Sequence, residues 1–172
     1  LSSLLHILLV DGRDTSAACI LLSQSDVVAH CDTGSLQAGV ASLDSRVSVQ
    51  SAAWLLLRDR AYAGLAARAM VNVAQGYDAN FSYCALRVLW THRDIVRQHV
   101  VDAHLGAEET DPDNEILRTL LLDGHDTRLL ASDVVAWMER SHNSSLVGDV
   151  ADYCAARAKE NDSMDDAVLR IE

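Results

Sequence analysis

The sequence predicts an all-α fold made of stacked antiparallel helical hairpins, a short α-solenoid. Three observations predict it: aromatic residues make up only 5% of the chain, Pro112 is its one proline, and apolar residues recur with helical spacing over most of its length. The apolar helices start near 47, 79, 113 and 145, so the starts recur every 32 to 34 residues. A globular helical bundle with coincidental spacing is the alternative architecture.

Alanine, leucine and valine supply the predicted core. Leucine and alanine lose little side-chain freedom in a helix, whereas strand-rich domains draw on aromatic and turn residues. Hydrophobic residues, counted as Ala, Val, Ile, Leu, Met, Phe, Trp, Tyr and Cys, make up 49% of the chain. This share is enough for one core at this length.

The predicted elements follow the apolar spacing in order along the chain. Helices are expected near 2–10, 14–24, 47–57, 60–75, 79–91, 94–105, 113–122, 126–141 and 145–159. The stretch 25–46 is ambiguous: it offers a short helix from Ser25 to His30, a turn at 32–35, and a further helix from Leu36 to Leu43. The expected organisation is one helical domain over 1–159, with hairpins near 1–24, 47–75, 79–105, 113–141 and 145–159, and an acidic tail or linker over 160–172.

Two hairpin links share a glycine followed two residues later by an aspartate, and weaker versions at 89–94 and 56–59 keep the aspartate. The segment 8–15, Leu-Leu-Val-Asp-Gly-Arg-Asp-Thr, matches the segment 120–127, Leu-Leu-Leu-Asp-Gly-His-Asp-Thr. Glycine ends a helix by adopting the left-handed conformation, and aspartate caps the amide groups of the next helix. We therefore expect Asp14, Asp59, Asp94 and Asp126 at helix beginnings.

Three helices show clear buried faces in the sequence. The expected core residues are Ala66, Ala69, Met70 and Val73; Leu130, Val134, Trp137 and Met138; and Leu146, Val150, Tyr153 and Cys154. Trp54 and Trp90 both lie late in a first helix, so we expect them to fill the same slot in successive repeats.

The segment 65–74, Leu-Ala-Ala-Arg-Ala-Met-Val-Asn-Val-Ala, resembles the run that ends many armadillo repeats. Together with the rhythm of the helices, it makes the chain similar to the armadillo/HEAT family of helical-repeat proteins. The resemblance implies an α-solenoid that binds other proteins.

The charge and apolar pattern exclude several classes of function. A formal net charge of −11, from 25 acidic and 14 basic residues, repels phosphate backbones, so direct nucleic-acid binding is not expected. Asp11, Asp26, Arg58 and Asp94 interrupt every apolar run long enough to cross a membrane. The first ten residues lack the basic region and cleavage site of a signal peptide. We therefore expect the chain to be intracellular, and cytoplasmic rather than organellar. Because it begins with Leu1, we also expect it to be part of a longer or processed protein.

A metal site of the HD phosphohydrolase type is the sharpest enzymatic alternative. Such enzymes are all-helical and hold divalent metal with a His, a His-Asp pair and a later Asp. Here His99, His125-Asp126 and either Asp149 or Asp152 would supply them. However, the twin of His125-Asp126 is Arg13-Asp14, which lacks the histidine, so the pair is explained more simply as a turn residue and a helix cap.

No other catalytic motif is present in the sequence. Cys19, Cys31, Cys84 and Cys154 are widely spaced among apolar neighbours, as buried free thiols are, and no nucleophile motif or phosphate loop accompanies them. We expect no cofactor. The predicted function is a non-catalytic scaffold or adaptor, a subunit or fragment of a larger assembly, whose acidic balance suits a basic segment of a partner protein. A compact helical regulator that binds a partner helix is the third alternative.

Overall fold

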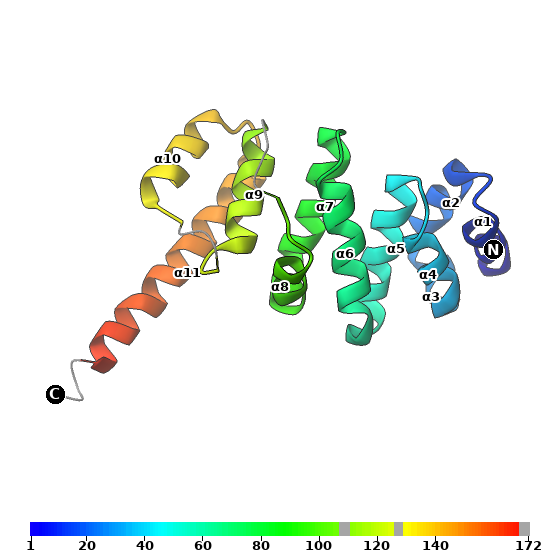
Figure 1. The fold of residues 1–172 in the computed structure, drawn as a ribbon, viewed down its shortest axis with the longest axis horizontal. Helices are drawn as coiled ribbons and strands as arrows, with labels where there is room; N and C mark the ends of the chain where they lie inside the picture. The colour runs from blue at the N-terminus through cyan, green and yellow to red at the C-terminus, as the bar shows by residue number, and fades with distance from the viewer. Residues whose placement is uncertain (107–110, 126–128, 169–172) are drawn as a thin grey trace. The chain divides into compact units, whose positions relative to one another are not determined.

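The computed structural model describes residues 1–106, 111–125 and 129–168, with side chains described as far as Lys159. The described residues form α-helices, one 3₁₀ turn and no strand, which confirms the all-α prediction (Figure 1). The helices are α1 (Ser2–Asp11), α2 (Thr15–Leu22), α3 (Ser25–Ala29), α4 (Thr33–Val40), α5 (Ser45–Arg58), α6 (Ala63–Ala74), α7 (Ala79–Thr91), α8 (Arg93–Asp102), α9 (Pro112–Leu122), α10 (Ala131–Arg140) and α11 (Ser144–Val168), and the 3₁₀ turn is Arg60–Tyr62.

The chain divides into two compact units. The N-terminal unit is Leu1–Leu129 and the C-terminal unit is Leu130–Glu172. The boundary falls inside the hairpin that the sequence predicts over 113–141, so α9 and α10 belong to different units.

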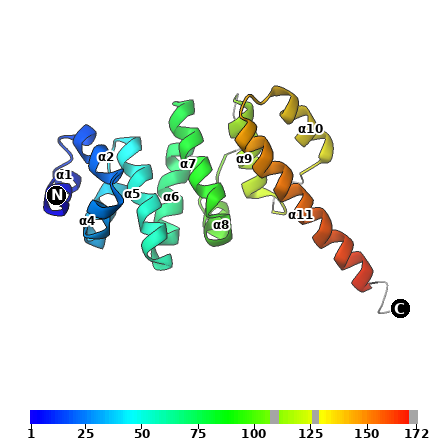
Figure 2. The same ribbon diagram turned by 180° about the vertical axis from the view of Figure 1, so that it is seen from behind.

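Helices of the N-terminal unit pack on their neighbours in the chain and on helices two or three further along. In succession, α4 contacts α5, α5 contacts α6 and α6 contacts α7, and these helices lie side by side in both views (Figures 1 and 2). A second set of contacts joins α2 to α5, α5 to α7 and α7 to α9, while α6 contacts α8. The core between them is aliphatic and includes Leu36, Leu55, Met70, Leu86 and Leu117, each fully buried.

The first hairpin link is built as the sequence predicts. Gly12 ends α1 with a φ of 64°, and its amide donates to the carbonyl of Leu8. The Asp14 carboxylate then accepts a 2.9 Å hydrogen bond from the amide of Ala17 and caps α2. Glycine tolerates this left-handed conformation because it has no β-carbon.

The other predicted aspartates differ in role. Asp59 caps the 3₁₀ turn, and Asp94 lies in the first turn of α8, whose N-terminal cap is His92. Asp126 lies outside the described residues. The prediction of a helix from 126 is corrected at its start, because Leu129 and Leu130 are not helical and α10 begins at Ala131.

The ambiguous stretch 25–46 contains two helices. α3 covers Ser25–Ala29, and α4 begins directly after Asp32, whose carboxylate accepts a 2.8 Å hydrogen bond from the amide of Ser35. The predicted turn over 32–35 is therefore wrong: its polar residues form the cap and first turn of α4. The helix also ends earlier than expected, at Val40.

All three predicted buried faces need correction, the first two as follows. In α6 the buried positions are Ala63, Ala66, Ala67, Met70, Val71 and Ala74, so the face is rotated and the predicted Ala69 and Val73 are only half-buried. Leu130 and Met138 are exposed, although Val134 and Trp137 beside them are buried as expected.

Three helices of the N-terminal unit begin at matching aspartates. Asp44, Asp78 and Asp111 cap α5, α7 and α9, at intervals close to those predicted for the helix starts. Four residues after the first two caps lie Ser48 and Ser82, both buried. Their hydroxyl groups donate to the last carbonyl of the preceding helix, Ser48 to Val40 at 2.9 Å and Ser82 to Ala74 at 2.7 Å.

The C-terminal unit consists of α10 and α11. Leu146 and Val150 are buried as predicted, whereas Tyr153 and Cys154 are half-buried. The Asn143 side chain caps α11 by accepting from the amide of Leu146 at 3.1 Å. The helix continues to Val168, past the predicted end at 159 and into the segment expected to be a tail. None of the described helices combines the length and apolar character needed to cross a bilayer.

Candidate binding cleft between α3 and α5

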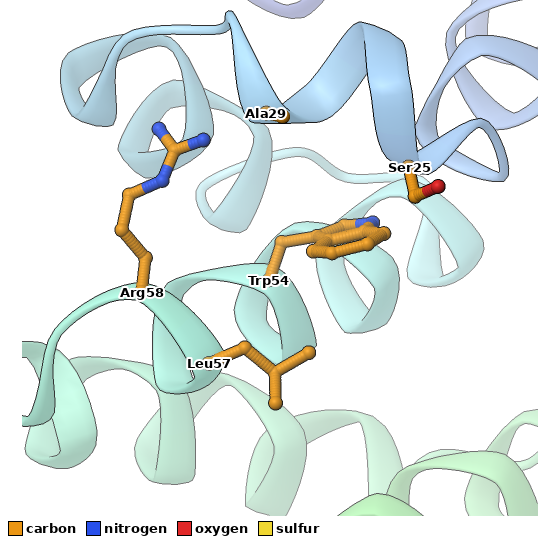
Figure 3. Close-up of a pocket in the computed structure, with 5 residues that line it drawn as sticks. All are labelled: Ser25, Ala29, Trp54, Leu57 and Arg58. Carbon is orange, nitrogen blue, oxygen red and sulfur yellow. The ribbon is translucent and has the colours of Figure 1, made fainter.

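A surface cleft of about 210 Å³ lies between α3 and the end of α5. Its lining residues are Ser25 and Ala29 from α3 and Trp54, Leu57 and Arg58 from α5 (Figure 3). The lining residues of α5 lie at helical spacing, since Leu57 follows Trp54 by three positions and Arg58 follows it by four. We name this feature the Trp54 cleft.

Trp54 is held in place by a hydrogen bond to another helix. Its indole Nε1 donates to the carbonyl of Leu22, the last residue of α2, at 2.8 Å. The ring is half-buried, whereas Trp90 and Trp137 are only 3% and 2% exposed. An anchored indole with an open face offers apolar contact area at a low entropic cost.

The prediction that Trp54 and Trp90 fill the same slot is wrong. Trp54 is the tenth residue after the cap Asp44, but Trp90 is the twelfth after the cap Asp78. Two positions in a helix correspond to a rotation of about 200°, so the two rings leave their helices on different sides. Trp90 is buried and Trp54 lines the cleft.

Arg58 brings a positive charge to the cleft. Its Nη2 donates to the carbonyl of Val28 at 2.6 Å and its Nη1 donates to the carbonyl of Cys31, so the guanidinium binds the carboxyl end of α3. Within the described part of the chain, no carboxylate lies within 4.0 Å of it. Cations at this end of a helix are favourable because the unpaired carbonyls carry partial negative charge.

The size of the Trp54 cleft decides what it can hold. Sites for cofactors and drug-sized ligands usually occupy about 300 to 1,000 Å³ and bury most of the ligand. A cleft of about 210 Å³ is below that range and suits one protruding side chain.

A second group of polar side chains joins α1 to α4. The Ser35 hydroxyl donates to Oδ2 of Asp32 and accepts from His6, whose Nδ1 lies 2.5 Å from Ser35 Oγ and 3.4 Å from Asp32 Oδ2. A neighbouring cleft of about 280 Å³ is lined by His6, Asp32, Ser2, Ser3, His30 and Cys31. The hydrogen bonds that Asp32 accepts from the Ser35 hydroxyl and the Ser35 amide lower the pKa of its carboxyl, and nearby His6 lowers it further.

This Ser-His-Asp group is not arranged as a catalytic triad. A triad uses the two ring nitrogens separately, one for the nucleophile and one for the carboxylate, whereas here Nδ1 of His6 faces both partners. Ser35 is also fully buried, so no substrate reaches its hydroxyl. The hydrogen bonds among His6, Ser35 and Asp32 link α1 to the first turn of α4.

Burial disfavours the nucleophilic thiolate at two of the four cysteines. Burial raises the pKa of the Cys31 thiol and of the Cys19 thiol, which favours the unreactive protonated form. Cys84 is exposed, contrary to the prediction of a buried thiol, while Cys31 is buried as expected. All four are free thiols.

The structure does not bring the candidate metal ligands together within the residues that it describes. His99 is half-buried on α8, with its ring against Gly64 of α6, and His125 is exposed in the turn after α9. Asp149 is exposed on α11 and belongs to the other unit, and Asp126 lies outside the described residues. No cluster of three His, Cys, Asp or Glu side chains with metal-binding geometry occurs in residues 1–106, 111–125 and 129–159.

Comparisons with known proteins add no family to this description. No protein-family model matches the chain, and neither a curated protein nor a solved structure matches it.

Proposed function

We propose that this chain is a non-catalytic scaffold that binds a segment of another protein by accepting an apolar side chain in the Trp54 cleft. The observation that carries the proposal is the cleft itself: an indole anchored to Leu22, beside Leu57, with room for a side chain. Tryptophan residues in such positions are enriched among those that dominate binding energy at protein interfaces.

The outer face of α1 supports an interaction role independently. Leu1, Leu4, Ile7 and Val10 are between 47% and 73% exposed, while Leu5 and Leu9 on the other side are buried. Contiguous exposed apolar residues of this kind mark surfaces that bind other proteins.

The repeated helix beginnings support membership of the armadillo/HEAT class as part of the same proposal. α5, α7 and α9 start at residues 45, 79 and 112, and each is capped by an aspartate. Stacked repeats of this length expose an extended surface along which a partner can bind. The alternative of an HD-type phosphohydrolase finds no supporting cluster among the described His, Cys, Asp and Glu residues.

The proposal is tested by nuclear magnetic resonance on the full ¹⁵N-labelled chain. The indole N–H signal of Trp54 is assigned by its loss in Trp54→Phe, and capped heptapeptides with a central leucine or a central alanine are titrated in. We expect the leucine peptides to shift the Trp54 signal more strongly than the alanine peptides, with little effect on the buried Trp90 and Trp137.

Two leucine variants make the test specific to the cleft. Leu57→Ser should weaken the leucine response, because Leu57 lines the cleft. Leu43→Ser should leave it unchanged, because Leu43 is fully exposed and does not line the cleft. If the central leucine gives no larger response than alanine at the Trp54 signal, the proposed function at this cleft is wrong.

A further inference from the structure

We propose that the segment bound in the Trp54 cleft carries a carboxylate two residues after its apolar side chain, and that Arg58 binds this carboxylate. The inference rests on the proposed function, since it specifies the occupant of the same cleft. It assigns to the partner an extended Leu-x-Glu or Leu-x-Asp type of sequence.

Arg58 keeps hydrogen-bonding capacity beyond its contacts to α3. A guanidinium has five N–H donors, of which one goes to the carbonyl of Val28 and one to the carbonyl of Cys31. These acceptors are neutral. Among the described residues, no carboxylate oxygen lies within 4.0 Å of the Arg58 guanidinium, although the chain has 25 acidic and only 14 basic residues.

The spacing of Arg58 and Trp54 sets the spacing of the ligand groups. The two residues are one helical turn apart, so their β-carbons are about 5 to 6 Å apart on the same face of α5. In Figure 3 the Arg58 side chain extends toward the carboxyl end of α3, whereas the Trp54 ring extends toward Ser25 at the other end of the cleft. In an extended segment, residues i and i+2 point to the same side about 7 Å apart, which suits an apolar group on Trp54 and a carboxylate at Arg58.

The charge of the cleft lining favours an acidic group, in contrast to the basic partner that the net charge suggests. Fields from distant acidic residues are screened beyond about 8 Å at physiological salt. Nearby, the Asp59 carboxylate accepts from the amide of Ala61, Arg60 is exposed, and Asp26 is exposed next to Ser25 on α3. Of the residues that line the cleft, Arg58 alone is charged.

The test uses the full chain and three capped peptides that differ at one position, Gly-Ser-Leu-Ser-Glu-Gly-Ser and its Gln and Lys versions. Binding is measured from the Trp54 indole signal at low and at 0.5 M salt. An exposed Arg-carboxylate pair gives a modest gain, so we expect the Glu peptide to bind about two- to fivefold more tightly than the Gln peptide at low salt. The preference should shrink at high salt because surface charges are screened.

Variants at two arginines separate the role of Arg58 from general charge. Arg58→Gln should abolish the preference for Glu over Gln, and Arg58→Lys should keep part of it. Arg60→Gln is the matched control, because Arg60 is also exposed but does not line the cleft. It should leave the preference intact.

The possible results distinguish this inference from the proposed function. If all three peptides bind equally, or the Lys peptide binds best, the carboxylate inference is wrong while the cleft remains a site for an apolar side chain. If none of them shifts the Trp54 signal, both are wrong. If Arg58→Gln destabilises α3, the test still holds on the unaltered chain. There, a preference for the Glu peptide over the Gln peptide that does not shrink at 0.5 M salt contradicts the inference.

Discussion

Gly39 of α4 lies directly against Ser51 of α5. A methyl group on Gly39 would lie 2.2 Å from Oγ and 2.9 Å from Cβ of Ser51, and 3.0 Å from Cδ2 of Leu9. Ser51 and Leu9 are both buried, so neither of these two side chains can move into solvent to make room for the methyl group. The absence of a side chain at Gly39 therefore allows α1, α4 and α5 to meet.

We predict that Gly39→Ala destabilises the chain. Overpacking of a tight contact costs about 1 to 3 kcal/mol, and the better helix propensity of alanine offsets up to about 1 kcal/mol of that. Urea denaturation followed by circular dichroism measures the change. Gly148→Ala is the control, because Gly148 is in α11 with no other atom within 4 Å of the new methyl group. A Gly39→Ala chain as stable as Gly148→Ala would show that the contact is not tight.

The buried hydroxyl groups of Ser48 and Ser82 should contribute measurably to stability. Each donates to the end of the preceding helix, so alanine removes a buried hydrogen bond and costs about 1 kcal/mol. Ser48→Ala, Ser82→Ala and the exposed control Ser16→Ala can be compared by urea denaturation. If all three variants are equally stable, these bonds do not hold the repeated turns together.

The Asp44 cap should make stability depend on pH in the acid range. The side-chain bond from Arg46 and the amides of Arg46 and Val47 lower the pKa of Asp44 from 3.8 to about 2, against the opposing effect of burial. A lowered pKa stabilises the folded chain above pH 4, and this contribution is lost as the pH falls from about 4 toward 2.

Asp44→Asn isolates the charge, because asparagine also caps helices well. Thermal unfolding between pH 2 and pH 6 should show a flatter pH dependence for this variant than for the unaltered chain, with a residual slope from Asp32, whose pKa is also lowered. Identical slopes would mean that the charge of Asp44 makes no difference to stability.

The two faces of α1 should respond differently to truncation. Leu5 is fully buried, so Leu5→Ala should cost about 2 to 5 kcal/mol. Ile7 is half-exposed on the outer face, and Ile7→Ala should change stability by less than about 1 kcal/mol. Comparable losses for the two variants in urea denaturation would show that the outer face is covered within the chain itself.

Local signals in the sequence were sufficient for the fold class and for most helix positions. Gly12 and Asp14 mark the first link because left-handed glycine and a capping carboxylate act within a few residues. The same kind of local signal led to the wrong prediction of a turn at 32–35, because polar residues such as Asp32 and Ser35 are equally typical of a turn and of a helix cap. Which one forms is decided by Leu36 and Val40, which are buried as part of α4.

The Trp54 cleft could not be predicted from the sequence, because it depends on how α3 lies against α5. Trp54 and Arg58 bind carbonyls about 30 residues earlier in the chain, those of Leu22, Val28 and Cys31. The spacing of apolar residues along the sequence does not indicate contacts between residues so far apart in the chain. The recurrence of Asp and Ser at 44 and 48 and again at 78 and 82 was a usable signal for the matching starts of α5 and α7. It would also have shown that Trp54 and Trp90 lie at different positions in these two helices.

The most direct measurement of the central claim is an intermolecular nuclear Overhauser experiment between the full chain and the bound leucine-glutamate peptide. The account predicts cross-peaks from the leucine methyl groups of the peptide to the indole ring of Trp54 and to the methyl groups of Leu57. Cross-peaks to Leu4 and Ile7 of α1 in place of Trp54 would contradict it.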